Sequence, residues 1–238
     1  MRKLILLIVF LNYLGLTQSK DPDEIIKNVV DKFNTVKDYQ VDLNIKVDID
    51  FLKVPDSKAK IYFKQPDKVH LESEGFALLP KDGLNFSPAY LARKDYTAIY
   101  ERDVDLDGFQ TSLVKVIPTG DKGNVILSTL WIDQKKNVIR KVETTTKTNG
   151  TFSMDFFYDE SLNYPLPNKI IFLFNIDQLN LPDVLNNGQN ATTSKKKKGR
   201  LNSTTKGRVI VTYTNYVVNK GIADSIFNSE TKKNSEQN

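Results

Sequence analysis

A regular alternation of apolar and polar residues restricts the possible folds of this chain more than any other feature of its sequence. Apolar side chains from Val41 to Ile49 alternate with polar ones from Asp42 to Asp50. Because successive side chains of a β-strand point to opposite faces, this pattern predicts a strand with one buried and one solvated face. The same period recurs along much of the chain, which indicates a sheet with one apolar face.

Further strands are predicted from the same period and from the turn residues between the runs. Pro55-Asp56 and Gln65-Pro66-Asp67 separate the first three strands, and Asn149-Gly150 is a strong hairpin signal. The later strands are expected at 95–101, 109–118, 123–133, 137–148, 151–159, 167–176 and 207–218. About ten antiparallel strands result. Because twist accumulates across so many strands, such a sheet splits, closes or curls.

One amphipathic helix precedes the sheet. Asp21 is a suitable N-cap, Pro22 suits the first turn, and the helix is expected to end near Lys37. Its apolar stripe needs a partner, and the apolar face of the sheet supplies one. We therefore predict an α+β fold: a curled antiparallel sheet of about ten strands, an incomplete β-barrel, with the N-terminal helix and short helical or lid elements on its concave side.

The first 19 residues have the pattern of a signal peptide. Arg2 and Lys3 precede the apolar run Leu4–Leu11, and Thr17-Gln18-Ser19 offers small residues for cleavage before Lys20. The apolar run is short for a bilayer span, so an uncleaved anchor is the weaker alternative. We expect a periplasmic protein with a signal peptide at 1–19, a single domain at 20–228 and a disordered tail at 229–238.

Positive charge is concentrated in one segment. Residues 184–206 are rich in Asn, Ser, Thr, Gly and Lys, a composition that predicts a disordered basic loop. The rest of the mature chain is mildly acidic, which argues against a nucleic-acid partner. The run Lys195–Lys198 is either a solvated part of this loop or a contact for an anionic membrane surface or an envelope membrane protein.

The composition excludes several kinds of chemistry. The chain has no cysteine and a single histidine, so it cannot carry a disulfide, a thiol nucleophile or a site that needs two imidazoles. His70 is expected on the solvated face of a strand. Asp103–Gly108 imitates the start of a calcium loop, but Val114 stands where the bidentate Glu is needed, so an acidic hairpin turn is expected. We predict no catalytic residue, metal site or cofactor.

Four segments resemble the LolA-like superfamily of periplasmic lipoprotein carriers and outer-membrane lipoprotein-sorting proteins. They are Tyr62–Lys68, Gly75–Pro80, Leu130–Asp133 and Asn215–Ile222, and the resemblance covers about residues 22–227. It implies an incomplete antiparallel β-barrel whose apolar cavity is covered by helices. It also implies binding of the acyl chains of a lipid or lipoprotein, without catalysis.

The predicted ligand site combines inward strand positions with an apolar loop. Gly75–Pro80 fits neither strand nor helix period and is expected to be either a lid or a core plug. The expected function is a non-enzymatic carrier or receptor for an apolar ligand, in outer-membrane lipoprotein sorting. The alternative is an envelope protein-interaction or stress-sensing module with a filled core; a hydrolase ranks behind both. The predicted lining residues are Leu43, Ile45, Val47, Ile61, Phe63, Val69, Leu71, Met154 and Phe156, and the lid residues are Phe76, Leu78 and Leu79.

Overall fold

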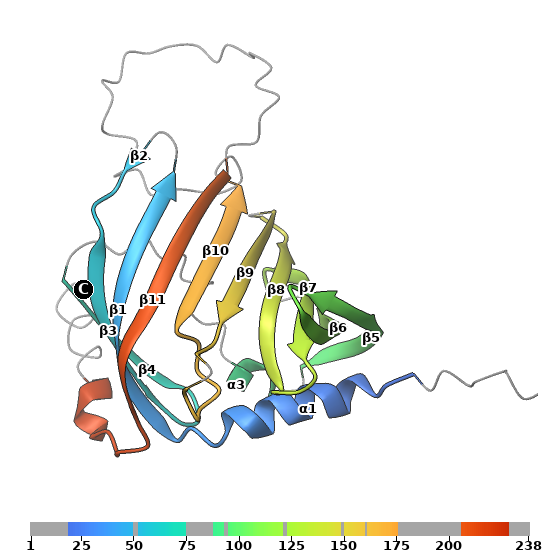
Figure 1. Ribbon diagram of the computed structural model, residues 1–238, viewed down its shortest axis with the longest axis horizontal. Helices are drawn as coiled ribbons and strands as arrows, with labels where there is room; N and C mark the ends of the chain where they lie inside the picture. Colours follow the sequence, from blue (N-terminus) through green and yellow to red (C-terminus); the bar gives the residue numbers. More distant parts are fainter. Residues whose placement is uncertain are drawn as a thin grey trace, which may run out of the picture.

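A curled antiparallel sheet forms most of the part of the protein that the structure describes, and one helix runs beside it (Figure 1). The computed structural model describes residues 19–49, 52–74, 88–92, 95–120, 123–148, 150–159, 161–175 and 206–228. Its elements are α1 (Pro22–Phe33), β1 (Asp38–Ile49), β2 (Leu52–Lys53), β3 (Ser57–Lys64), β4 (Lys68–Glu74), α3 (Pro88–Leu91), β5 (Tyr96–Leu106), β6 (Phe109–Pro118), β7 (Val125–Asp133), β8 (Val138–Thr146), β9 (Thr151–Phe157), β10 (Lys169–Asn175), β11 (Lys206–Val218) and the 3-10 helix η4 (Asp224–Asn228).

The strand order leaves the sheet open. Ten strands follow one another as β4-β3-β1-β11-β10-β9-β8-β7-β6-β5, and the short β2 pairs with β1. β4 and β5 are therefore the two edges, and within the described residues no ladder joins them into a closed barrel. The predicted fold, a curled antiparallel sheet of about ten strands with an N-terminal helix, is confirmed.

Helix α1 begins where the sequence predicts and ends earlier. The Asp21 side chain accepts a hydrogen bond from the backbone N–H of Asp23, which caps the helix. The helix ends at Phe33, whereas the apolar period continues to Val36, which is fully buried just beyond it. α1 contacts α3, β5 and β8, so it lies against the half of the sheet that ends at the β5 edge.

Two predicted turns take the expected form. Gly150 has a positive φ of 65°, and its carbonyl accepts a hydrogen bond from the Thr146 N–H, which closes the β8–β9 hairpin. Between β5 and β6, Asp107 and Gly108 both have positive φ, as a two-residue hairpin turn requires. The Asp103–Gly108 segment is thus the acidic end of β5 followed by a hairpin turn at Asp107-Gly108.

Several predicted segments lie outside the described residues. They are most of the signal peptide, the apolar loop 75–80, most of the basic loop and the tail. At the end of the basic loop, Lys206 already belongs to β11 and pairs with Asn175 of β10. Within the described ranges, no helix is long and apolar enough to cross a bilayer.

Candidate functional site

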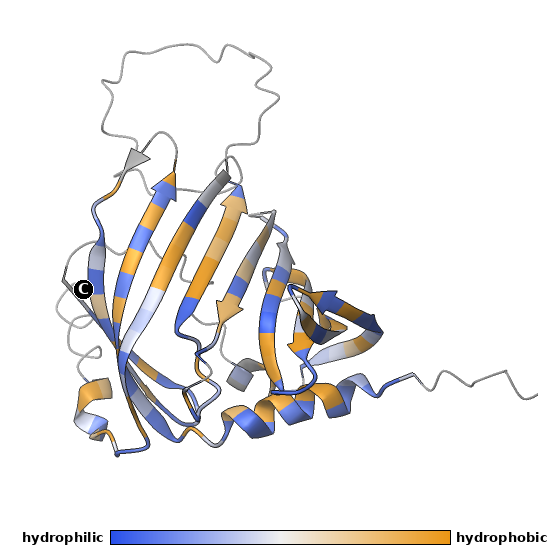
Figure 2. Cartoon of the chain, in the orientation of Figure 1, coloured by the Kyte–Doolittle hydropathy of each residue, from blue (hydrophilic) through white to orange (hydrophobic). Residues whose placement is uncertain are grey.

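The inner face of the curled sheet is apolar across most of its width. Figure 2 shows apolar and polar residues alternating along β1. Directly paired residues of an antiparallel ladder point to the same face, so the register identifies each row of side chains. One such row crosses seven strands from β1 to β6, and every member is buried. The row consists of Val47, Val209, Phe172, Met154, Val142, Leu130 and Val114.

The neighbouring row is less completely buried. It joins Ile45 and Val211, which are buried, to Ile170 of β10, which keeps part of its surface accessible, and to Phe156. Phe152 of β9, two positions before Met154 on the same face, is also half-buried. The inner face is therefore tightly packed in its central row and retains accessible apolar surface beside it.

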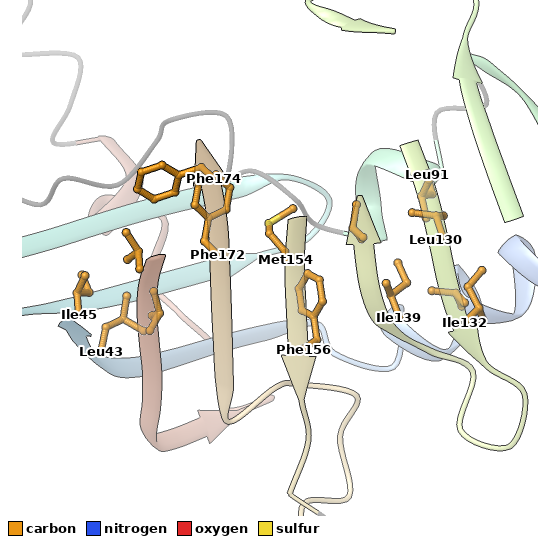
Figure 3. Close-up of a cluster of buried hydrophobic side chains, with 14 of the residues drawn as sticks. Leu43, Ile45, Leu91, Leu130, Ile132, Ile139, Met154, Phe156, Phe172 and Phe174 are labelled. Carbon is orange, nitrogen blue, oxygen red and sulfur yellow. The ribbon is translucent and has the colours of Figure 1, made fainter. Parts of the chain in front are cut away.

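Two helices close one side of this face. Ile26 and Val29 of α1 and Leu91 of α3 belong to the same buried cluster as the inward strand residues. Figure 3 shows Leu91 beside Leu130. The Tyr96 hydroxyl donates a hydrogen bond of 2.8 Å to the Leu91 carbonyl, which holds α3 against β5.

Most of the predicted lining residues that the structure describes come together. Leu43, Ile45, Val47, Met154 and Phe156 are buried members of the cluster (Figure 3 labels four of them). Ile61 and Leu71 are half-buried against it.

Phe63 and Val69 are placed differently, although they pair directly across β3 and β4. Phe63 packs in a second cluster with Phe33, Val36, Leu166 and Val218. Val69 is 49% exposed, because it lies on an edge strand. The predicted lid residues Phe76, Leu78 and Leu79 lie outside the described residues.

The sequence interpretation missed the contribution of β10. Ile170, Phe172 and Phe174 all face the cluster, together with Val209 and Val211 of β11. Residues 170–174 are an unbroken apolar run, so alternation alone does not assign a face to them. The pairing of Phe172 with Val209 and Met154 decides which side chains point inward.

A cluster of four tyrosines, Tyr39, Tyr158, Tyr213 and Tyr216, lies at the end of the inner face where β9 ends and β10 begins. The rings of Tyr213 and Tyr216 stack with centroids 6.2 Å apart, and Tyr39 meets Tyr216 edge-on at 5.8 Å. Burial raises the pKa of Tyr39 to about 12. Burial, and for Tyr213 and Tyr216 also the neighbouring tyrosines, raises the pKa of the other three hydroxyls as well. The tyrosine cluster therefore adds polar hydroxyls to a largely apolar inner face.

His70 is less exposed than predicted. Only 13% of its side chain is accessible, its ring lies 6.0 Å from that of Tyr62, and its Nδ1 is buried without a hydrogen-bond partner among the described residues. The expectation of a solvated histidine was wrong, because Tyr62 on the adjacent strand packs beside the ring. Among the described residues, no three acidic or histidine side chains gather as metal ligands would.

A partly open pocket of about 330 Å³ lies where the end of α1 meets the β7–β8 turn and the segment after β9. Three lysines line it, Lys32, Lys135 and Lys136, together with Tyr158 from the tyrosine cluster and Asp159. The Asp159 carboxylate accepts hydrogen bonds from the backbone N–H and the hydroxyl of Ser161. Tyr158 thus lines this lysine-lined pocket and also packs against the apolar cluster.

Solved structures of the same architecture decide the fold family. A putative outer membrane lipoprotein-sorting protein domain from Vibrio parahaemolyticus superposes with a TM-score of 0.63 at 9% identity, over 89% of this chain and 98% of that one. The fold is LolA-like. A LolA superfamily protein from Nitrosomonas europaea gives 0.54 at 11% identity, over 87% and 97% of the two chains. A DUF1329 family protein from Desulfovibrio piger gives 0.57 at 11% identity, over 89% and 99%.

The likeness extends to the fold and not to the sequence. No family model matches this chain, and no curated protein matches it. At 9–11% identity the LolA-like fold itself is what the chain shares with these structures. The function must therefore be argued from the residues of this chain.

Proposed function

We propose that this protein is a non-enzymatic carrier or receptor that binds the acyl chains of a lipid or lipoprotein on the inner face of its sheet. The observation that carries the proposal is the pair of adjacent apolar rows. One is fully buried, and the other keeps accessible apolar surface at Ile170. Accessible apolar surface inside a curled sheet is costly in water and is typical of a binding site. The lipoprotein-sorting domain from Vibrio parahaemolyticus has the same fold, which supports this role.

The free energy gained by burying an acyl chain in such a site is large enough for a carrier to bind its ligand. Each buried methylene contributes about 0.8 kcal/mol, so a chain of about sixteen carbons would gain on the order of 12 kcal/mol before the costs of binding. A carrier must also release its ligand, so part of this gain has to be offset by opening the site.

The segment from Gly75 to Pro80, with Phe76, Leu78 and Leu79, is proposed as the lid of this site. β4 and α3 are consecutive in the described chain, but β4 is one edge of the sheet, and α3 packs beside β5 at the other edge. The segment that joins these two elements in the sequence contains apolar residues, which match the apolar inner face.

The carrier role requires export, and we propose that residues 1–19 are a signal peptide that directs the protein to the periplasm. N-terminal sequencing of the exported protein should begin at or near Lys20. In the structure the Lys20 Nζ lies 2.6 Å from an Asp103 carboxylate oxygen of β5, so cleavage before Lys20 keeps this contact. Recovery of intact Met1 from the envelope fraction would contradict the proposal.

Acyl binding is tested with an environment-sensitive apolar dye. The wild type should bind the dye with micromolar or better affinity, and Ile170→Glu should abolish binding because a carboxylate in the site excludes an apolar ligand. Ile170 is half-buried on the inner face, so the new carboxylate retains contact with water in the free protein.

The matched control is Leu173→Glu. Leu173 lies on the same strand, is 38% exposed and points to the opposite face, because it pairs with Ser153 and Arg208. This variant should bind the dye as the wild type does. Equal loss of binding in both variants, or no dye binding by the folded wild type, would contradict the carrier proposal.

The second candidate function is an envelope interaction or sensing module with a filled core. The complete burial of the central row, with Leu130 and Val142 at 0% exposure, favours it. A folded wild type that binds no dye, and for which native mass spectrometry of envelope-purified protein finds no lipid, would support this second function.

The partners proposed for a carrier follow from its ligand. They are the acyl chains of a lipid or lipoprotein and, through Lys195–Lys198, an anionic membrane surface or an envelope membrane protein. Those lysines lie between Asn175 and Lys206, which pair at the ends of β10 and β11, so the segment that holds them starts and ends at one point of the sheet.

A further inference from the structure

The tyrosine cluster occupies the next position after the apolar rows on the inner face. The Tyr213 N–H donates to the Asn168 carbonyl, and the Asn168 N–H donates to the Phe157 carbonyl, so the ladder continues past the start of β10. The register then aligns Leu43, Tyr213, Asn168 and Tyr158 across four chain segments. This row follows the one that contains Ile45, Ile170 and Phe156, so the inner face changes from apolar to polar within one step of the register.

Two of the tyrosine hydroxyls already have protein partners. The Tyr158 hydroxyl donates to the Ile139 carbonyl at 2.8 Å, and the Tyr216 hydroxyl donates to the Pro167 carbonyl at 2.7 Å. Both hydrogen bonds are made to the backbone and stabilise the fold. These two tyrosines therefore build the wall of the polar region rather than offer free groups.

Three polar groups of the same region have no such partner. In the part of the chain that the structure describes, the hydroxyls of Tyr39 and Tyr213 make no hydrogen bond, and the Asn168 Oδ1 is buried and unpartnered. Of these three, the Asn168 Oδ1 is the buried atom, and a buried polar atom is normally satisfied by the protein, by water or by a ligand, whereas Tyr39 and Tyr213 keep some accessible surface. Two O–H donors and one amide oxygen at the end of an apolar surface thus have the arrangement of a recognition site for a polar group.

The environment of these groups favours an uncharged ligand group. Tyr39, Tyr213 and Asn168 each keep some accessible surface, yet burial raises the pKa of both hydroxyls, so the region is largely desolvated. The buried charges of the described residues already have partners: Arg140 and Asp133 form an ion pair with each other, and the Asp38 carboxylate accepts the backbone N–H groups of Lys220 and Gly221. An anionic head group placed here would lose its hydration without gaining a counterion.

We propose that Tyr39, Tyr213 and Asn168 bind the uncharged polar head group of an acyl ligand whose chain lies along the adjacent apolar rows. The tyrosine hydroxyls donate to a carbonyl oxygen of the head group, and the Asn168 amide oxygen accepts from its O–H or N–H. The ligand class is therefore a neutral acyl ester or amide, such as a monoacylglycerol. This inference rests on the proposed acyl-binding function and names its ligand.

Displacement of the apolar dye by two probes of equal chain length tests the inference. The probes are 1-monolauroylglycerol and dodecanoate, both used below their micellar concentrations. The wild type should bind the glycerol ester more tightly than the carboxylate. The double variant Tyr39→Phe/Tyr213→Phe should weaken binding of the ester about tenfold while leaving the dye affinity unchanged. Its melting temperature should not fall, because neither hydroxyl has a protein partner to lose.

Tyr216→Phe is the matched control within the same cluster. Its hydroxyl is bound to the Pro167 carbonyl, so its loss should lower the melting temperature and leave the preference for the ester unchanged. Dye binding without any preference for the ester, or an unchanged preference in the double variant, would overturn the inference alone. Tighter binding of dodecanoate would also overturn it and would point to the lysine-lined pocket. Absence of dye binding by the wild type would overturn the acyl-binding function and the inference with it.

Discussion

Replacement of Arg140 by methionine should lower the free energy of unfolding by about 3–5 kcal/mol, because it leaves a buried carboxylate without its counterion. The side chains of Arg140 and Asp133 are only 6% and 5% exposed. The Arg140 Nε and Nη2 donate to Asp133 Oδ2 at 3.0 and 2.8 Å, and the guanidinium lies 3.7 Å from the centroid of the Phe109 ring. Denaturant unfolding of both proteins measures the difference.

The Asp133 carboxylate also stabilises the β7–β8 turn. Its Oδ1 accepts the backbone N–H groups of Lys135 and Lys136, both at 2.9 Å. Burial acts to raise the pKa of Asp133, but these N–H groups and the guanidinium outweigh it and hold the pKa below its usual value. Adding Asp133→Asn to Arg140→Met should therefore recover part of the loss, since asparagine removes the charge and keeps an acceptor for the turn.

An exposed pair with the same chemistry provides the control. Arg208 Nε and Nη2 donate to Asp48 Oδ2, and the two side chains are 52% and 42% exposed. Arg208→Met should change the free energy of unfolding by less than about 1 kcal/mol. A loss below about 1 kcal/mol in Arg140→Met would show that the buried pair does not stabilise the fold as argued.

The sheet was predictable because its pattern is local. From Val41 to Ile49 every second residue is buried in the structure, as the alternation predicts, and β1 alone identifies an inner and an outer face. The hairpin at Gly150 was equally predictable, because glycine at positive φ is a local requirement. Features set by neighbours in sequence were thus recovered from the sequence.

Features set by strand pairing were not predictable in the same way. Phe63 and Val69 continue the inward period of β3 and β4, but Phe63 packs into a separate cluster, and Val69 is on the edge strand. Their environments depend on which strand lies beside them, and a period-two pattern carries no information about the neighbouring strand. The face of β10 was undetermined for the same reason.

The tyrosine cluster is the clearest example of a site that sequence analysis could not assemble. Tyr39 and Tyr213 are far apart in sequence, and both lie beside the ring of Tyr216 because β1 pairs with β11. A register shift between Gln40 and Asp42, where Asn215 of β11 has a φ of 57°, places Tyr216 beside Tyr39. The positions of these hydroxyls therefore follow from one irregularity in one ladder.

The same cluster predicts a steep loss of stability at alkaline pH. Tyrosine in an unfolded chain ionises near pH 10, whereas burial raises the pKa of Tyr39 to about 12 and raises the pKa of Tyr158, Tyr213 and Tyr216 as well. Below about pH 10 both states hold these protons, and stability is unaffected. Above it the unfolded chain loses protons that the folded protein keeps, so the free energy of unfolding falls as pH rises from about 10 to about 12. Each such tyrosine contributes a slope of up to about 1.4 kcal/mol per pH unit.

We therefore expect tyrosinate absorbance and circular dichroism to change together in one cooperative transition. Tyr39→Phe should reduce the slope of this fall in the free energy of unfolding by the contribution of one tyrosine. Gradual ionisation near pH 10 with the fold intact would mean that these hydroxyls are solvated and that the cluster is not a desolvated site.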